Sequence, residues 1–353
     1  MKRLILKKNI LRKIIDALVA ARVGILLLLV VAGLLLLSDL PNQKNSKSDI
    51  KNIAIFKFSS SPFLDNTERG LIDGLSARGF IEGKSIRLTR YCAENDLPTA
   101  NTIAKEIINK KFDIVLTAST PALQVMANAN KNGDVIHVFA AVTDPFLSGV
   151  GLDRSHPEMR PEHLAGLGTF QPVEESIFIA RQMNPGLKKI GVPWCNHETC
   201  SEACVTIARK VCDSLGIELL EANVENTTSV LEAAQSLVAR GAEALWIGGD
   251  NTVEVAFELM VKAGKNGNIP AFCNDPELVK KGALFGLGAN YYEVGLAGGN
   301  IAADILEGKN PSDIPIQNVV PEKLFINTKA LKGLKGNWNI AENLLQRADS
   351  IAR

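Results

Sequence analysis

Residues 113–145 have the sequence "DIVLTASTPALQVMANANKNGDVIHVFAAVTDP". Residues 113–118 and 135–142 are short apolar runs rich in β-branched residues, and residues 121–131 between them have helical spacing. Two strands joined through a helix pair in parallel. This stretch therefore predicts a parallel sheet covered by helices.

The same alternation extends outward in both directions. It begins at residue 52, stops in the Gly- and Pro-rich residues 148–170, and resumes over residues 188–292. We interpret residues 148–170, which have no clear periodicity, as the crossing into a second unit. The chain is thus predicted to form two α/β units of similar size, and a helix at residues 293–308 follows them.

The composition is that of a globular protein with a sizeable core and gives no support for nucleic-acid binding. The 353 residues exceed one ordinary domain, and 46% are apolar, which is enough for a sizeable core. The formal net charge of +1 does not favour nucleic acid as a partner. Only 5% of the residues are aromatic, so aromatic residues that cluster near a site are a stronger indication of a role there.

Residues 1–50 differ from the rest and are interpreted as a signal or anchor helix and a tether. Seven Lys and Arg residues precede fifteen uncharged apolar residues, 23–37, an order typical of an export signal. Residues 17–37 are long enough to remain as an uncleaved anchor to the inner membrane, and cleavage is the alternative. The basic flank would stay in the cytoplasm, which places the folded body outside it.

Six predicted strands end in small hydroxyl, amide or carboxylate side chains. These ends are residues 59–62, 117–121, 142–145, 194–198, 248–252 and 273–277. Ligands of open parallel sheets bind beyond the carboxyl ends of the strands. At any single end the same residues could simply cap a helix. Helix N-termini suit a carboxylate and aspartates suit an ammonium group, so the six ends together indicate a zwitterionic ligand.

Several blocks support a family resemblance. In order they are "FDIVLTASTPALQVMANA", "VFAAVTDPFLSG", "GGDNTV", "NDPELVKKGALFGLGANYYEVG" and "GKNPSDIPI". Together they resemble a family of periplasmic-binding-protein-like substrate-binding components of ABC transporters, which includes tryptophan- and tyrosine-binding members. The resemblance covers about residues 50–328.

This resemblance implies the type I periplasmic-binding-protein fold, an α/β architecture of two Rossmann-like lobes with parallel sheets joined by crossing hinge strands, here preceded by the N-terminal membrane helix. Lobe 1 would contain residues 51–165 and 290–312, and lobe 2 residues 166–289 and 313–353. The lobes would close over a small solute, an aromatic amino acid or a similar zwitterion.

The implied partners are this small-molecule ligand, an ABC permease and its ATPase. The resemblance implies no catalysis, no cofactor and no nucleic acid, and we expect a monomer in the periplasm or at the cell surface. A ligand-binding sensor that works with a partner receptor is the alternative.

The resemblance also implies the pocket. On lobe 1 it suggests the hydroxyl and carboxylate side chains of Ser60, Ser61, Ser119, Thr120, Thr143 and Asp144. On lobe 2 it suggests Asn196, Asp250, Asn251 and Asp275. Phe63 and Tyr291 are placed to supply ring faces to an aromatic ligand.

Residues 194–204, "WCNHETCSEAC", depart from the family, whose members usually have an aromatic residue followed by Asn-Ser-Ser-Glu-Ala-Asn-Ser. Three interpretations stay open. The cysteines are small core residues, which we favour; Cys195 and Cys200 close a disulfide; or Cys195, His197, Cys200 and Cys204 bind zinc or copper. The spacing matches no well-defined metal motif.

Overall fold

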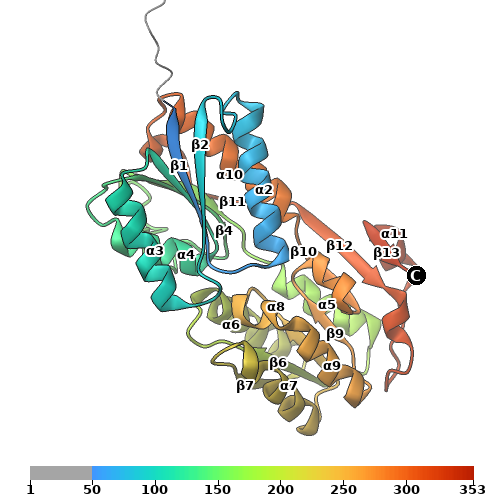
Figure 1. Cartoon of the computed structure of the whole chain (residues 1–353). Coiled ribbons are helices and arrows are strands. Elements are labelled where there is room, and N and C mark those ends of the chain that lie inside the picture. The colour runs from blue at the N-terminus through green and yellow to red at the C-terminus, as the bar shows by residue number, and fades with distance from the viewer. Residues whose placement is uncertain (1–49) are drawn as a thin grey trace, which may run out of the picture. The chain divides into compact units, whose positions relative to one another are not determined.

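The computed structural model describes residues 50–353, which contain two sheets with helices packed on both faces (Figure 1). The first sheet has six strands in the order β11-β5-β4-β3-β1-β2. These are β1 (Lys51–Lys57), β2 (Ile86–Cys92), β3 (Ile114–Ala118), β4 (Ile136–Val142), β5 (Leu164–Gly168) and β11 (Gln317–Asn318). All of its pairs are parallel, including β3 with β4, as residues 113–145 predict.

The second sheet has seven strands in the order β13-β12-β10-β9-β8-β6-β7. These are β6 (Lys189–Trp194), β7 (Glu218–Asn223), β8 (Ala244–Ile247), β9 (Ala271–Cys273), β10 (Phe285–Ala289), β12 (Glu322–Asn327) and β13 (Ser350–Ala352). Only β12 runs antiparallel to its neighbour β10. The chain reaches β12 from the first sheet by a short connection and not through a crossover helix. Parallel pairing of β12 with β10 is therefore not required.

We call each sheet with its helices a lobe. The first lobe contains α2 (Pro62–Ala77), α3 (Leu97–Lys110), α4 (Thr120–Ala129), η3 (Pro311–Asp313) and α10 (Tyr291–Leu306). The second contains α5 (Val173–Met183), α6 (Thr199–Ser214), η1 (Thr227–Ser229), α7 (Val230–Ala239), α8 (Asn251–Val255), α9 (Phe257–Gly267), η2 (Pro276–Lys281), η4 (Thr328–Leu331) and α11 (Glu342–Arg347).

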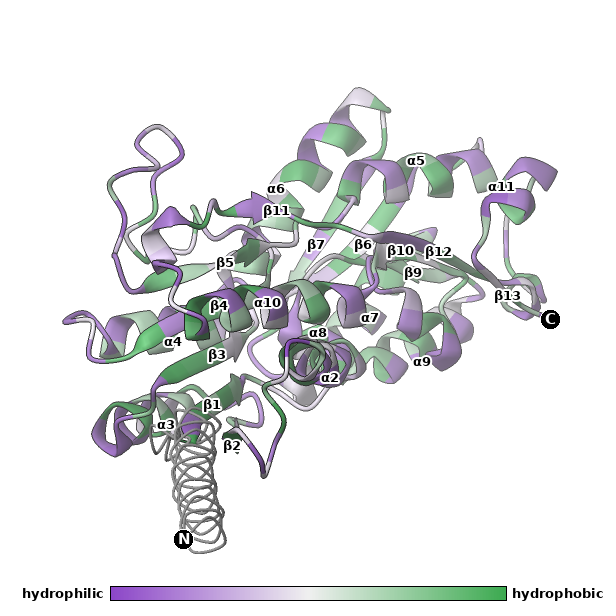
Figure 2. Cartoon of the chain, turned by 90° about the horizontal axis from the view of Figure 1, so that it is seen from above, coloured by the Kyte–Doolittle hydropathy of each residue, from purple (hydrophilic) through white to green (hydrophobic). Residues whose placement is uncertain are grey.

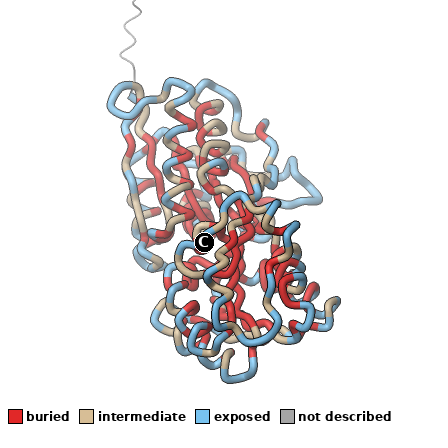
Figure 3. The backbone as a smooth tube through the Cα atoms, turned by 90° about the vertical axis from the view of Figure 1, so that its right-hand side faces the viewer, coloured by how far each residue is buried: buried red, intermediate tan, exposed pale blue. Residues whose placement is uncertain are grey.

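Alternation along the strands divides the core of each lobe into two layers. In β1, Ile53 and Ile55 pack with α2 and α10, whereas Ala54 and Phe56 pack with α3 and α4. Successive side chains of a strand point to opposite faces, so a sheet covered on both sides needs apolar residues at every position. The central strands of both lobes, such as β3 and β8, are accordingly buried throughout, whereas edge strands such as β7 and β11 contain exposed residues, and hydrophilic residues lie on the outer sides of the helices (Figures 2 and 3).

The second lobe follows the same rule. Trp246 of β8 packs in the layer formed with α5 and α6, and its neighbours Leu245 and Ile247 pack with α7 and α9. Trp246 is fully buried, and its indole N–H donates to Asn274 Oδ1 (2.9 Å). The few aromatic residues of the chain therefore include a central core residue of this lobe.

Close packing of α2 against α10 joins distant parts of the chain in the first lobe. The two helices meet through Gly70 and Gly74 on α2 and Gly295 and Gly299 on α10. A Cβ atom at Gly70 would lie 2.1 Å from Tyr292 O, and one at Gly295 would lie 2.1 Å from Thr67 O. Only glycine permits this approach of the two backbones.

The chain passes between the sheets three times. β5 pairs with β4 and is followed by α5; β10 is followed at Asn290 by α10; and β11 of the first sheet is followed by β12 of the second. The connecting segments are residues 169–172, Asn290 and residues 319–321. The lobe ranges predicted from the sequence place the crossings between the lobes after residues 165, 289 and 312. These ranges stay a prediction.

No helix between residues 50 and 353 is long and apolar enough to cross a membrane. The predicted signal or anchor, residues 17–37, lies outside the residues that the structure describes.

Candidate ligand-binding site

The carboxyl ends of the two sheets face each other, and two side-chain hydrogen bonds connect them. Asn95, which follows β2, donates from Nδ2 to Thr252 Oγ1 on α8 (3.2 Å). Gln124 of α4 donates from Nε2 to Thr199 Oγ1 on α6 (3.0 Å). Both bonds join lobe to lobe, so the lobes are in contact across the region where a ligand is expected.

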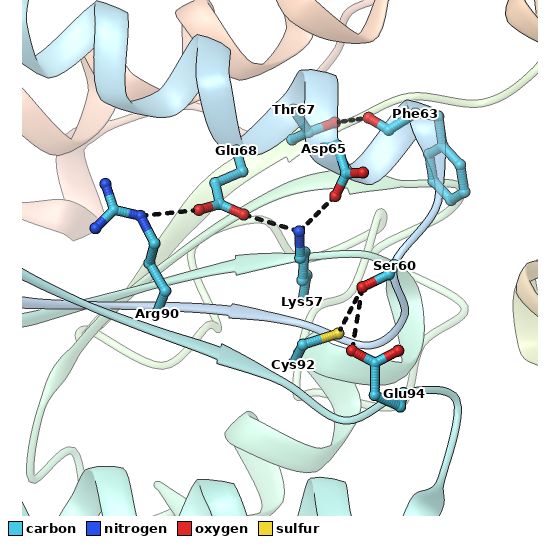
Figure 4. Close-up of polar contacts among 9 residues, drawn as sticks. All are labelled: Lys57, Ser60, Phe63, Asp65, Thr67, Glu68, Arg90, Cys92 and Glu94. Atoms are coloured by element: carbon cyan, nitrogen blue, oxygen red, sulfur yellow. Dashed lines mark hydrogen bonds and ion pairs between the residues drawn. The ribbon is translucent and has the colours of Figure 1, made fainter.

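The three serines after β1 differ in their hydrogen bonding. Ser60 donates to Glu94 Oε1 (3.1 Å) and contacts Cys92 Sγ (3.6 Å), as Figure 4 shows. Ser59 and Ser61 are buried, and neither hydroxyl has a hydrogen-bond partner within residues 50–353. Ser61 is the N-cap residue of α2, yet its side chain makes no capping hydrogen bond. Ser59 and Ser61 are thus available to a ligand, whereas Ser60 is not.

Lysine and arginine side chains beside these serines are already paired. Lys57 Nζ lies 2.9 Å from Glu68 Oε2 and also pairs with Asp65, and Arg90 pairs with Glu68 (Figure 4). Arg90 also pairs with Glu82. These cations therefore stabilise β1, β2 and α2 and do not attract a ligand carboxylate.

Two hydroxyls that follow β3, those of Ser119 and Thr120, are used inside the first lobe. Ser119 has a φ of 102°, a backbone conformation that favours glycine, and its Oγ accepts from the N–H of Ala122 (3.3 Å) as the cap of α4. Thr120 Oγ1 accepts from the N–H of Thr143 (3.3 Å). These contacts fix the turn that follows the two strands.

Asp144 is also occupied by its own lobe. Its carboxylate accepts from the N–H of Phe146 (3.0 Å) and from Arg154 Nη2 (2.7 Å). Thr143 and Asp144 line a cavity of about 420 Å³ together with Arg154 and Phe170. Asp144 therefore has less to offer a ligand than its position after β4 suggests.

On the second lobe, Asp250 holds the loop before α6 and the start of α8 together. Its Oδ2 accepts from the N–H of Cys195 and the hydroxyl of Ser201 (both 2.7 Å), and its Oδ1 accepts from the N–H of Val253 (2.8 Å). Burial raises its pKa, and the nearby Glu198 carboxylate adds to the rise. Asp250 thus serves as a helix cap with all its contacts inside the protein.

Glu198 is a second buried carboxylate, which the sequence analysis did not assign to the site. It accepts from the N–H and Nδ2 of Asn251 (2.9 and 2.7 Å) and from the N–H and Oγ1 of Thr252 (2.9 and 2.6 Å). Its oxygens therefore orient both residues at the start of α8. Asn251 Oδ1 has no partner in the described part of the chain.

Two further carboxylates are buried with one free oxygen each. Glu254 Oε2 and Asp275 Oδ2 make no hydrogen bond to any residue of 50–353, and these side chains are 4% and 1% exposed. Burial raises the pKa of Asp275 to about 7. Burial also raises the pKa of Glu254 well above its ordinary value, and the Asp275 carboxylate adds to the rise. Buried carboxylates without partners are costly, which is typical of a site that binds a cation.

A pair of rings lies beside these carboxylates. The centroids of Phe63, from α2, and Tyr291, from the start of α10, are 4.9 Å apart. The Tyr291 hydroxyl accepts from Gln171 Nε2 (3.0 Å), and Gln171 Oε1 accepts from Cys204 Sγ (3.4 Å). Burial, with the charges of Glu254 and Asp275, raises the pKa of Tyr291. Both rings thus belong to the first lobe, and Gln171 of the connecting segment 169–172 fixes the position of Tyr291.

The cysteines of residues 194–204 have separate surroundings. All six cysteines of the chain lie in the described residues and are free thiols. Cys204 is part of the second lobe's core, and Cys200 Sγ donates to Glu198 Oε2 (3.4 Å). Burial raises the pKa of Cys195 to about 11 and that of Cys204 to about 12, so both are protonated at neutral pH.

No group of three or more possible metal ligands occurs among residues 50–353. Asn196 and His197 are exposed in the loop before α6, whereas Cys195, Cys200 and Cys204 are buried. The stretch therefore starts a helix, and the core-cysteine interpretation is the one that the geometry of Cys204 fits.

The predicted pocket residues thus fall into two groups. Ser61, Asn251 and Asp275 each have a buried side-chain oxygen without a partner among residues 50–353, and Phe63 and Tyr291 form the ring pair. The other side chains are engaged inside one lobe (Ser60, Ser119, Thr120, Asp144 and Asp250), exposed (Asn196), or buried without a side-chain hydrogen bond to any residue of 50–353 (Thr143). For both groups, contact with a ligand remains a prediction.

Five polar residues of this region were missed. They are Ser59, Asn95, Gln171, Glu198 and Glu254. Asn95 follows a predicted strand, so the rule applied to the other strand ends would have found it. Within residues 194–204, Glu198 matches the Glu of the family's usual pattern, and this match was the signal for it. Glu254 has no signal of its own, because a carboxylate inside a helical pattern is expected to be solvated.

Comparisons with known proteins agree with this architecture. A family model described as ABC transporter substrate binding protein matches residues 52–352. A curated relative, "Tyrosine-binding protein" of Clostridioides difficile (strain R20291), is 28% identical over 303 residues, 86% of each chain. A conserved domain protein from Vibrio cholerae has a TM-score of 0.81 at 29% identity, covering 86% of this chain and 100% of its own.

Two other solved structures differ in ligand state. An ABC domain from Streptococcus pneumonia in complex with L-Trp has a TM-score of 0.79 at 23% identity, covering 86% of this chain and 100% of its own. A ligand-free, open substrate-binding protein from Clostridium difficile has 0.63 at 27% identity, covering 86% and 99%. The open structure has the higher identity but the lower TM-score.

Proposed function

Since this chain belongs to the family of ABC transporter substrate-binding proteins, we propose that it binds an aromatic amino acid between its two lobes. As a member of the family it is the substrate-binding component of an ABC transporter, works outside the cytoplasm and acts with the other components of the transporter. One observation supports the ligand class most directly: two buried carboxylates with free oxygens lie near enough to Tyr291, one of a pair of aromatic rings, to raise its pKa.

The carboxylates suit the ammonium group of an amino acid. Glu254 Oε2 and Asp275 Oδ2 can only accept once ionised, and an ammonium group supplies three donors. A charge-assisted bond also offsets the cost of the buried charges. A ligand without a cationic group would leave both oxygens unpaired.

The start of α2 suits the ligand's carboxylate. The hydroxyls of Ser59 and Ser61 are buried and free among the described residues, and they lie where α2, a helix of 16 residues, begins. Helix N-termini carry a partial positive charge and free N–H groups. The first lobe would therefore hold the carboxylate while the second holds the ammonium, so that full binding requires both lobes together.

The rings of Phe63 and Tyr291 suit an aromatic side chain. Aromatic pairs contribute about 0.5–1.5 kcal/mol beyond the burial of their area. The two relatives named for tyrosine and crystallised with L-Trp support the same ligand class.

The remaining parts of the proposal concern the chain as a whole. We propose that it hands its ligand to a permease driven by an ATPase, catalyses no reaction, acts as a monomer and is held at the membrane by residues 17–37. A sensor function is not favoured, since the family is one of transport components.

Isothermal titration of the full chain, purified in mild detergent, tests the ligand class. We expect saturable 1:1 binding of L-tyrosine or L-tryptophan and no binding of the same compounds with a blocked amino group. Binding that is unaffected by blocking the amine would contradict the role of Glu254 and Asp275.

Affinity should also depend on pH. Below its pKa of about 7, Asp275 is protonated and must release its proton to accept from an ammonium group. Besides burial, which raises this pKa, the hydrogen bond from the N–H of Glu277 lowers it, the Glu277 carboxylate raises it, and Lys281 and Lys280 lower it. The charges of Asp275, Asp250, Glu198 and Lys281 act in turn on Glu254. Ligand affinity should therefore rise about tenfold from about pH 6 to about pH 8 for this one carboxyl.

Titrations in buffers of different ionisation enthalpy should show proton release on binding below neutral pH. The stability of the ligand-free protein should change in the opposite direction and fall as pH rises. A carboxyl whose pKa is higher in the folded than in the unfolded state loses stability as pH rises from about 4 to about 7. An affinity that falls over the same pH range in which we expect a rise would refute the assignment of Asp275.

A further inference from the structure

The site contains more buried acceptor atoms than one ammonium group requires. Besides the acidic pair, Glu254 and Asp275, the carbonyl oxygens of Asn95 and Asn251 are buried and have no partner within residues 50–353. We call Asn95 and Asn251 the amide pair. They flank Thr252, to which Asn95 is hydrogen-bonded and which Asn251 precedes in α8.

The orientation of each amide is determined by its neighbour. Thr252 Oγ1 gives its only proton to Glu198 Oε1 (2.6 Å), so it can only accept from Asn95, which must present its NH₂ group. Glu198 Oε2 can only accept, so Asn251 must also present its NH₂ group (2.7 Å). Both carbonyl oxygens are therefore the free atoms, and turning either amide over would place two acceptors or two donors together.

The amide pair and the acidic pair differ in charge. An ammonium group forms its stronger bonds with carboxylates, so it belongs to Glu254 and Asp275. A neutral carbonyl oxygen in a buried site suits a neutral N–H or O–H donor. Asn251 and Glu254 lie one turn apart on α8, so a donor at the amide pair is separate from the ammonium group yet within the span of one small molecule.

We propose that the site selects amino acids whose side chain carries a second hydrogen-bond donor, an aromatic N–H or O–H, and that Asn95 and Asn251 receive it. This inference rests on the proposed function. A site that hydrogen-bonds such a group rejects the analogue that lacks it, because the buried acceptors are then left unpaired. We expect L-phenylalanine to bind about 10- to 100-fold more weakly than the better of L-tyrosine and L-tryptophan.

The variant Asn95→Gly tests the role of the amide pair. Asn95 has a φ of 62°, which glycine adopts freely, so the change removes the side chain without straining the loop. The ratio of the phenylalanine Kd to the Kd of the better ligand should fall about tenfold toward equality. Asn251→Ala should lower the ratio in the same way and serves as the second variant.

Gln124→Ala is the matched control. Gln124 also donates its amide across the lobes to a threonine, Thr199, but its carbonyl oxygen is not among the buried atoms without a partner. Loss of this contact should weaken all three ligands alike and leave the ratio unchanged. A contact that merely keeps the lobes together would behave in this way.

Titration of the full chain and its variants with the three amino acids separates the outcomes. If the unchanged chain binds phenylalanine as tightly as tyrosine and tryptophan, or if Asn95→Gly keeps the full ratio, the inference is wrong while the proposed function stands. If none of the three amino acids binds, the proposed ligand class is wrong and the inference fails with it.

Discussion

Replacement of Gly295 by alanine should lower the free energy of unfolding by about 3 kcal/mol or more. The new Cβ would lie 2.1 Å from Thr67 O and 3.0 Å from Gly70 Cα, which are backbone atoms of a neighbouring helix. The α2 and α10 backbones would have to separate, and the layer that they form on the first sheet would lose its packing. On helix propensity alone the same change should stabilise α10 by about 1 kcal/mol, so the two expectations differ in sign.

Thermal unfolding followed by circular dichroism measures this effect. Gly186→Ala is the control, because a Cβ there meets only Asn184 Oδ1 at 3.5 Å, an ordinary contact, and the residue does not have a positive φ. That variant should stay within about 0.5 kcal/mol of the original chain. A Gly295→Ala protein as stable as the control would show that α2 and α10 do not pack this closely.

Replacement of Asp275 by asparagine should weaken ligand binding by about 10- to 150-fold, corresponding to about 1.5–3 kcal/mol for a hydrogen bond to a charged group. The change keeps the size of the side chain and removes the negative charge beside the proposed ammonium group. Asparagine caps a helix as well as aspartate does, so the cap of η2 on the N–H of Glu277 (2.9 Å) should persist. The pH dependence of affinity should decrease in the same variant.

Asp144→Asn is the matched control for this prediction. Asp144 was predicted from the sequence as an equivalent pocket residue, but the structure engages its carboxylate with Arg154 and with the turn that follows. Isothermal titration should give an affinity close to that of the unchanged chain. A larger loss for Asp144→Asn than for Asp275→Asn would reverse the assignment of the two carboxylates.

The sequence predicted the two-sheet architecture, and residues 113–145 show why. A strand, a helix and a strand can be recognised within 33 residues, because hydrophobic periodicity and turn residues are local signals. Pairing of β3 with β4 in parallel then follows from the helix between them. The antiparallel strand β12 has no such local signal, because its direction depends on where the chain returns from the first sheet.

The candidate site was predicted only in its location. The rule that ligands bind at the carboxyl ends of parallel strands pointed to the edge at which the two sheets face each other. It could not separate Ser61, whose hydroxyl is buried and free among the described residues, from the adjacent Ser60, which is paired with Glu94. Nor could it show that Glu198 organises the start of α8, since these residues are more than 50 positions apart.

The sequence by itself determined that this chain forms two α/β lobes, belongs to a family of substrate-binding proteins and places small polar residues where the lobes meet. Only the tertiary structure decided which of these residues remain available to a ligand. The physical reason is that a polar atom is free or occupied according to the partner it finds in space. Arg154 occupies Asp144, Glu198 occupies Thr252, and nothing in the described chain occupies the free oxygens of Glu254 and Asp275.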